Sequence, residues 1–316
     1  MNEFEAINLI VNRLGSVATG EGVTIGPGDD GAVVRFEPEE ETVVTSDVLV
    51  EQQHFPAGSP AGLVGYRSVA ANISDLSGMG ARPRYLTIAL TTESIDKSWL
   101  LAFADGVRAC CEETGTIVVG GNLAKGPKSI AITALGSVLS GRSIARSGAD
   151  VGDDIWLTGA VGASVVALKR LRLPIDGTLE EFMKIRDVDA IARYFLPIPR
   201  VDFASLLIEF ASSATDVSDG LACELSQLSS ASSKKMRVDL DLVPVWDCAD
   251  WREAVQSDDS YEILFTAPVS KRAEIHSAAA QTKTPVAQIG YVQEGNEVEL
   301  LTKQGAIEVG VGFSHF

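Results

Sequence analysis

The chain has 316 residues, 46% of them hydrophobic, so it can bury sizeable cores and we expect two domains. Its formal net charge is −17 at pH 7, and because so acidic a chain repels a polyphosphate backbone, nucleic acid is not an expected partner. No apolar run reaches membrane-spanning length, and the first ten residues hold two acids and no base, unlike a signal peptide. Four cysteines without a CxxC pair fit a reducing compartment, so we expect a cytoplasmic protein with no membrane partner.

The first half alternates between helix-like and strand-like patterns. Helical segments repeat apolar residues at i, i+3 and i+4, and short apolar runs bounded by turn residues mark the strands. In chain order we expect a helix at 3–14, strands at 32–36 and 42–45, a helix from Pro60, a strand at 85–91, a helix at 99–113, and strands at 116–119 and 130–138. An irregular loop should join the last two strands. Asp75 lies off the apolar stripe of its helix, which predicts an exposed side chain.

Segment 148–153 is polar and contains glycine, so it reads as a domain junction. We therefore expect a first domain of residues 1–148 and a second of residues 149–316. The patterns of the second half predict strand 155–158, helices 163–170, 187–194, 201–209 and 221–229, strands 237–242 and 262–266, helix 270–281 and two or three more strands.

Short acidic and glycine-rich turns carry most of the chemical information. They are GPGDDG at 26–31, SD at 46–47, SD at 74–75, GGN at 120–122 and DVSDG at 216–220. Carboxylates in such turns suit Mg²⁺, which is usually held by a few carboxylates together with substrate phosphates. Any one of these aspartates could instead shape its turn, and Asp219 could cap the helix that follows it.

Two familiar phosphate-binding motifs nearly match, and both are rejected. Gly26, Gly28 and Gly31 satisfy the GxGxxG pattern, but that motif must open a helix, whereas Ala32 begins a strand-like run. The GGNLAKG segment resembles the start of a P-loop, but Pro127 stands where the lysine belongs and lacks an amide donor.

Several longer segments together resemble one family. They are GPGDD at 26–30, TSDVLVEQQHF at 45–55, ANISDLSGMGARP at 71–83, GGNLAKG at 120–126, ARSGA at 145–149, DVSDGL at 216–221 and GFSHF at 312–316. Their order and content are similar to those of the thiamine-monophosphate kinases, within the superfamily of aminoimidazole ribotide synthetase. The resemblance covers nearly the whole chain.

The resemblance implies an α+β fold with two domains. An N-terminal α/β domain would bind ATP and Mg²⁺ and form a homodimer through its sheet, and a C-terminal α+β domain would follow. The implied reaction transfers the γ-phosphoryl group of ATP to thiamine monophosphate. Because its acceptor is already an anionic phosphate oxygen, catalysis would consist of positioning and charge neutralisation by several Mg²⁺ ions.

The resemblance also implies roles for particular residues. Asp219 would bind metal near the transferred phosphate and is the candidate catalytic residue. The other implied metal ligands are Asp30, Thr45, Ser46, Asp47, Asp75, Asn122 and Asp216. The implied ATP contacts are Gly121, Asn122, Arg146 and Ser218. The implied contacts of thiamine monophosphate are His54, Asp259 and Phe313.

Three positions depart from the family pattern. Asn122 stands where the family has an aspartate, and it offers a carbonyl oxygen without a charge. Lys125 replaces an arginine and loses the bidentate fork. Asp259 stands where a substrate-contacting glutamate belongs and is one methylene shorter. Two other functions therefore stay open: a divergent enzyme that phosphorylates another small phosphomonoester, and a non-catalytic ATP-binding dimer.

Overall fold

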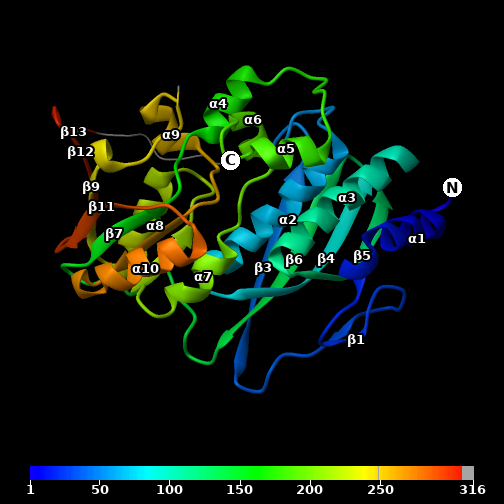
Figure 1. Cartoon of the computed structure of the whole chain (residues 1–316), viewed down its shortest axis with the longest axis horizontal. Coiled ribbons are helices and arrows are strands. Elements are labelled where there is room, and N and C mark those ends of the chain that lie inside the picture. Colours follow the sequence, from blue (N-terminus) through cyan, green and yellow to red (C-terminus); the bar gives the residue numbers. More distant parts are fainter. Residues whose placement is uncertain (248, 308–316) are drawn as a thin grey trace.

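The computed structural model describes residues 1–247 and 249–307 (Figure 1). Its α-helices are α1 (Glu3–Leu14), α2 (Ala61–Gly78), α3 (Lys97–Thr114), α4 (Ala163–Arg170), α5 (Leu179–Ile185), α6 (Ala190–Phe195), α7 (Val201–Leu207), α8 (Leu221–Ser232), α9 (Trp251–Ser257) and α10 (Arg272–Thr282). Short 3-10 helices lie at Gly15–Ala18, Leu240–Leu242 and Val269–Lys271. Among these helices none is long and apolar enough to cross a membrane.

The strands form three sheets. They are β1 (Val23–Ile25), β2 (Val33–Val34), β3 (Glu40–Val50), β4 (Arg82–Thr92), β5 (Ile117–Lys125), β6 (Ser129–Leu139), β7 (Asp154–Thr158), β8 (Ser213–Asp216), β9 (Lys235–Asp239), β10 (Ile263–Ala267), β11 (Val286–Gln293), β12 (Val298–Thr302) and β13 (Gly305–Ile307). The first half builds a four-stranded sheet in the order β3-β6-β4-β5. The second half builds a seven-stranded sheet in the order β13-β12-β9-β11-β7-β10-β8.

Helix α2 lies at the centre of the molecule, where it packs on the first sheet, on α3 and on elements of the second half (Figure 1). Almost every side chain of α2 is buried, because neighbours surround the helix. This burial corrects the expectation for Asp75, which is partly buried rather than exposed, while Asn72 on the same helix is fully buried. The apolar stripe was a poor guide because a helix enclosed on all sides needs no polar face.

Strand β5 is longer than expected. The GGN segment was expected in an irregular loop, but β5 continues through it to Lys125, and only residues 126–128 connect it to β6. Gly121 pairs with Ile88 in the parallel β4–β5 ladder, and a β-carbon at Gly121 would lie only 2.1 Å from the Ile88 carbonyl oxygen. Gly121 therefore allows the backbones of β4 and β5 to approach closely within the sheet, and it does not form a turn.

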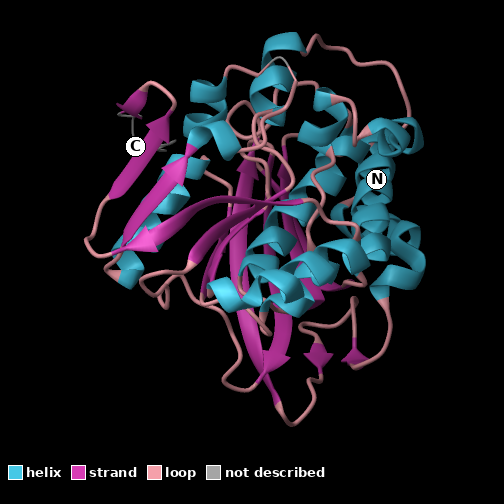
Figure 2. Ribbon diagram, turned by 60° about the vertical axis from the view of Figure 1, so that its left-hand side comes forward, coloured by secondary structure: helices cyan, strands magenta, loops and turns pink. Residues whose placement is uncertain are grey.

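Helices cover one face of the first sheet and leave the other open (Figure 2). On edge strand β3 the side chains alternate, so Thr45 and Asp47 face the covered side while Val44 and Val48 point away. Val44 is 60% exposed and Val48 is 49% exposed. The second half has two apolar clusters of its own, one on each side of its sheet, built around Leu264 and Phe265.

Candidate active site

Three carboxylates meet where α2 lies between the two sheets. Asp47 comes from β3, Asp75 from α2 and Asp216 from the end of β8. Thr45 Oγ1 donates a hydrogen bond of 2.5 Å to Asp75, and Ser74 Oγ donates one of 2.7 Å to Asp216. The three aspartates thus share a small volume, although up to 169 residues separate them in the sequence (216 minus 47).

Glycine at the end of α2 allows this meeting. A β-carbon on Gly78 would lie 2.8 Å from the backbone nitrogen of Asp216 and 3.1 Å from the carbonyl carbon of Thr215. Such distances are too short for any side chain, so α2 and β8 can approach this closely only with glycine at position 78. The close approach brings Asp75 and Asp216 together.

Burial and mutual repulsion disfavour the charged forms of these carboxylates. Burial raises the pKa of Asp75 to about 6, and the neighbouring Asp47 carboxylate adds to this rise. Burial and the carboxylate of Asp75 raise the pKa of Asp216 well above its ordinary value. Burial also raises the pKa of Asp47. Partly desolvated carboxylates that repel one another are relieved by a divalent cation, so this donor set fits a hard metal ion.

On one side of this cluster lies a cavity of about 540 Å³, which we call the Arg146 pocket. Its lining includes Thr45, Asp75, Arg146 and Asp216. Arg146 Nε donates a 3.2 Å hydrogen bond to Thr215 Oγ1, and the guanidinium lies 3.8 Å from Glu224. Because the Arg146 side chain is about half exposed, it can also reach an anionic ligand in the pocket.

On the other side lies a cavity of about 530 Å³, which we call the His54 pocket. Asp75 lines both pockets, so the carboxylates stand at their junction. The expected site residues that line the His54 pocket are Ser46, Asp47, His54, Asp75, Ser218, Asp219 and Asp259. The backbone N–H of Val50 donates a 3.0 Å hydrogen bond to His54 Nδ1. A neutral His54 therefore carries its hydrogen on Nε2.

Asp259 reaches the His54 pocket from a buried support. The guanidinium of Arg67, on α2, donates hydrogen bonds to Asp259 and to the carbonyl oxygen of Tyr194. It lies 4.1 Å from the centre of the Tyr194 ring and 5.5 Å from that of Tyr261. Sequence reasoning missed Arg67, because a lone arginine among apolar helix residues gives no sign of its partner.

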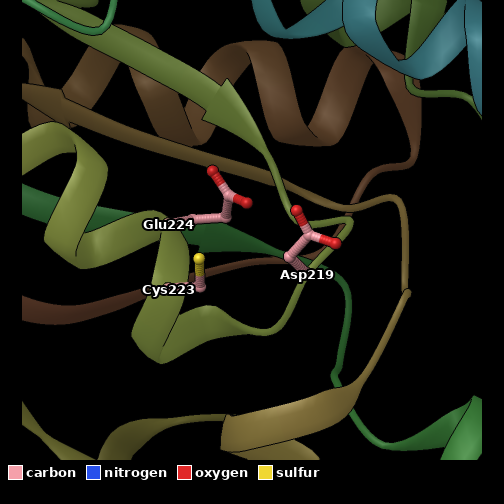
Figure 3. A group of neighbouring side chains, drawn as sticks. All are labelled: Asp219, Cys223 and Glu224. Atoms are coloured by element: carbon pink, nitrogen blue, oxygen red, sulfur yellow. The ribbon is translucent and has the colours of Figure 1, made fainter. Parts of the chain in front are cut away.

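The turn after β8 places Asp219 beside two residues of α8 that the sequence analysis did not single out (Figure 3). Ligand atoms of Asp219, Cys223 and Glu224 all lie within 4.8 Å of one another. Burial raises the pKa of Glu224 to about 7, although Arg146 opposes the shift. Gly220 is the N-cap of α8 and the cap has no side-chain hydrogen bond, so Asp219 does not cap this helix.

The structure does not bring every expected residue to this site. Asp30, Gly121 and Asn122 line a separate cavity of about 240 Å³ beside α1 and α3. Asp47 pairs with Ile132, Ile132 with Ile88, and Ile88 with Gly121, so Asp47 and Gly121 lie in one row at opposite edges of the sheet. Three strand spacings separate them, about 14 Å.

Asn122 stands apart from the carboxylate cluster for a second reason. Asn122 pairs with Ala89 and points to the open face of the sheet, opposite to the side that Asp47 faces. Within one chain Asn122 therefore cannot bind the same metal ion as Asp47. Phe313 lies outside the described residues.

The sequence and the fold both place the chain among known proteins. Residues 28–138 match the family described as AIR synthase related protein, N-terminal domain, and residues 150–303 match AIR synthase related protein, C-terminal domain. The chain is 35% identical over 280 residues to the thiamine-monophosphate kinase of Salmonella typhimurium. This alignment covers 85% of this chain and 84% of that protein.

Solved structures agree with these matches. The thiamine-monophosphate kinase of Stenotrophomonas maltophilia K279a aligns with a TM-score of 0.84 at 32% identity, over 95% of this chain and 96% of that one. AaThiL complexed with AMPPCP and TMP aligns with a TM-score of 0.76 at 26% identity, over 99% and 97%. The expected aminoimidazole ribotide synthetase-like fold of α+β class is confirmed. The chain therefore belongs to the thiamine-monophosphate kinase family within the AIR synthase related proteins.

Proposed function

We propose that the chain transfers the γ-phosphoryl group of ATP to thiamine monophosphate and so forms thiamine diphosphate and ADP. The observation that carries this proposal is the junction of the Arg146 pocket and the His54 pocket at Asp75. Two ligands that occupied these pockets would meet at the carboxylate cluster. The related AaThiL structure holds AMPPCP and TMP together, as such a reaction requires.

The Arg146 pocket suits the polyphosphate of ATP, because Arg146 is its cationic side chain. The His54 pocket suits the acceptor. There a neutral His54 can donate from Nε2 to the acceptor phosphate, and Asp259 can contact the organic part of thiamine monophosphate. Ser218 lines this pocket near the junction, from which it could reach the terminal phosphate of ATP.

Mg²⁺ fits the carboxylate cluster, because these acids have raised pKa values and offer oxygen donors. Asp47, Asp75 and Asp216 would hold it, with Thr45 and Asp219 beside them. The Ser46 hydroxyl is hydrogen-bonded to Ile132 on the open face of the sheet, so Ser46 would offer only its backbone carbonyl. Mg²⁺ bound here would offset the charge of the two phosphate-bearing substrates. Without it, the aspartates would repel both substrates.

The proposed transfer is in line. A phosphate oxygen of thiamine monophosphate forms a bond to the γ-phosphorus of ATP while the bond from that phosphorus to the β–γ bridging oxygen breaks, and ADP leaves with that oxygen. Because the attacking oxygen is already anionic, no strong base is needed. The task of this chain is to hold the two phosphates in contact and to exclude other orientations.

A homodimer is part of the proposal. The open face of the first sheet has a central row without charge, formed by Val48, Ala131, Ala89 and Asn122. A second copy of the chain could cover this face and also pair with edge strands β3 and β5, which have no outer neighbour among the described strands. Such pairing would also bring the partner's Asn122 toward the edge that carries Asp47.

An ADP-release assay with thiamine monophosphate as acceptor tests the proposal. We expect release that depends on both Mg²⁺ and thiamine monophosphate, and its loss in Asp47→Asn with an unchanged circular dichroism spectrum. Release with another small phosphomonoester but not with thiamine monophosphate would show the divergent enzyme, which the shorter side chain of Asp259 favours. ATP binding with no ADP release for any acceptor would show a non-catalytic module.

A further inference from the structure

A third large cavity lies in the second half of the chain, away from the carboxylate cluster. It has a volume of about 860 Å³, and we call it the Arg193 pocket. It has no lining residue in common with the Arg146 pocket or the His54 pocket. Its wall contains four basic side chains, Arg170, Arg193, Arg200 and Lys283, together with the indole of Trp246. The proposed kinase reaction makes no use of this cavity.

Arg193 is the residue that makes this cavity a candidate site. Its side chain is only 10% exposed, and among the described residues its guanidinium makes one hydrogen bond, of 2.9 Å from Nη2 to Asp187. The buried Nε and Nη1 atoms have no hydrogen-bond acceptor among the described residues. Burial lowers the pKa of this guanidinium, which shows that the site stabilises the cation poorly. Orphaned donors of a buried cation are costly unless an acceptor approaches them.

Three of the four acids that line the pocket already accept hydrogen bonds from the protein. Glu262 accepts two hydrogen bonds from Arg200, of 2.7 and 2.6 Å. Asp187 is paired with Arg193, and Asp189 caps α6 through the backbone N–H of Ala192. The acid left over is Asp247 at the rim, which is exposed.

The remaining bases are not engaged. In the described part of the chain, the side chains of Arg170 and Lys283 have no carboxylate within ion-pair distance. Both are exposed at the rim, whereas Arg193 lies deep. The guanidinium of Arg193 lies 5.7 Å from the centre of the Trp246 ring, which forms a flat apolar wall beside it. The lining residues therefore include two buried donors of Arg193 without an acceptor, and two bases, Arg170 and Lys283, without an ion-pair partner among the described residues.

We propose that the Arg193 pocket binds a small metabolite through a phosphate or carboxylate group. Arg193 would be the inner contact of that group, Arg170 and Lys283 would attract it at the rim, and Trp246 would pack against the rest of the ligand. Because this pocket is separate from the two substrate pockets, its ligand would bind in addition to ATP and the acceptor. The proposal does not depend on the identity of the acceptor.

Tryptophan fluorescence gives a direct test. The full-length protein is titrated with sodium phosphate and, separately, with sodium acetate, in buffer that contains EDTA and is held at constant ionic strength with sodium chloride. We expect saturable quenching that is absent in Trp246→Phe, whose other tryptophans are unchanged. The anion that quenches at lower concentration shows whether phosphate or carboxylate is preferred. No saturable change with either anion would overturn the proposal.

Rim variants test the location without disturbing the buried arginine. The double variant Arg170→Gln, Lys283→Asn should raise the dissociation constant about tenfold, as expected for the loss of charge-assisted contacts. Asparagine is chosen because Lys283 has a φ of 54°, which asparagine tolerates. Lys169→Gln is the matched control, because Lys169 is paired with Glu253 outside the pocket. Equal affinity in the double variant and in this control would reject the site.

Discussion

Arg67 on α2 and Asp259 just before β10 form an ion pair beneath the His54 pocket, although 192 residues separate them. The arginine is 1% exposed and the aspartate 29% exposed, so the positive end is buried and the negative end faces the pocket. In the proposed reaction, the pair would present to the acceptor an aspartate that is shorter than the glutamate of the family pattern, from a rigid base. Arg67 is therefore a positioning residue for Asp259.

Removal of the Asp259 charge should affect the acceptor more than the nucleotide. We expect Asp259→Asn to raise the KM for thiamine monophosphate by about tenfold, the effect of one charge-assisted contact, with little change in the KM for ATP. Steady-state kinetics with each substrate varied in turn measures both values. Asp176→Asn, an exposed aspartate outside the pocket, is the control. An equal rise in both KM values would show that Asp259 does not contact the acceptor.

Stability without metal should depend on pH through Asp75. Its pKa is raised from 3.8 to about 6 in the folded chain, so the folded state holds this proton more tightly than the unfolded state. An acid whose pKa is raised by folding adds to the free energy of unfolding at low pH, and this added stability is lost as the pH rises from the lower value to the higher. In EDTA, Asp75→Asn should therefore increase the free energy of unfolding at pH 7 by about 1–2 kcal/mol, and by much less at pH 4.

Mg²⁺ should reverse that difference. At pH 7 the ion should stabilise the unmodified protein against urea and leave Asp75→Asn nearly unchanged, because the variant lacks a ligand. Urea unfolding at both pH values, with EDTA or with MgCl₂, gives all the comparisons. Asp75 would not be an ionised metal ligand if Asp75→Asn increased the free energy of unfolding equally at pH 4 and pH 7. The same would follow if Mg²⁺ stabilised the variant as much as the parent.

Gly78 should tolerate no side chain. Gly78→Ala places a β-carbon 2.8 Å from the backbone nitrogen of Asp216, so α2 and β8 must separate. We expect a loss of about 1–3 kcal/mol in stability and a larger fractional loss of kcat than of native circular dichroism, since Asp75 and Asp216 move apart. Gly126→Ala, where the added carbon meets Thr91 at an ordinary 3.7 Å, is the control. Normal activity in Gly78→Ala would mean that their spacing is unimportant.

A charge on the open face of the first sheet should break the proposed dimer. Val48 is 49% exposed in the single chain, so Val48→Glu should leave the fold intact while burying a charge in any interface on that face. Light scattering at micromolar concentration should report a dimer for the parent and a monomer for the variant. Val188→Glu, at an 81% exposed position outside the sheet, should remain dimeric. A dimer in all three proteins would place the interface elsewhere.

Asn122 can join the metal site only through a second copy of the chain, because it lies at the far edge of its own sheet. If the partner's Asn122 does approach Asp47, Asn122→Asp should lower the Mg²⁺ concentration for half-maximal rate by about fivefold to tenfold, since it adds a carboxylate. A magnesium titration of both proteins measures this. A depressed or right-shifted curve for the variant would favour a different metal arrangement and the divergent enzyme.

Local patterns were sufficient for most of the elements. Helical spacing predicted α1, α3 and α4 nearly to the residue, because amphipathic helices on a surface keep their period in the sequence. The same reasoning failed for Asp75 and for the GGN segment. Helix α2 is buried on all sides, and the glycines of β5 allow close strand pairing. In neither case does the periodicity of the sequence reveal these surroundings. The domain boundary at 148/149 stays a prediction.

The candidate site divides in the same way. The sequence alone marked the acidic segments, since carboxylates beside glycine and serine are unusual in a core and suit cations. Only the tertiary structure decided which of these segments meet, and it places Asp47 in a strand and Asp75 in a helix. Strand order puts Asp47 and Asn122 at opposite edges of one sheet, the glycine at position 78 brings Asp75 to Asp216, and a buried arginine supports Asp259. These relationships depend on packing between distant segments, which leaves no periodic signal along the chain.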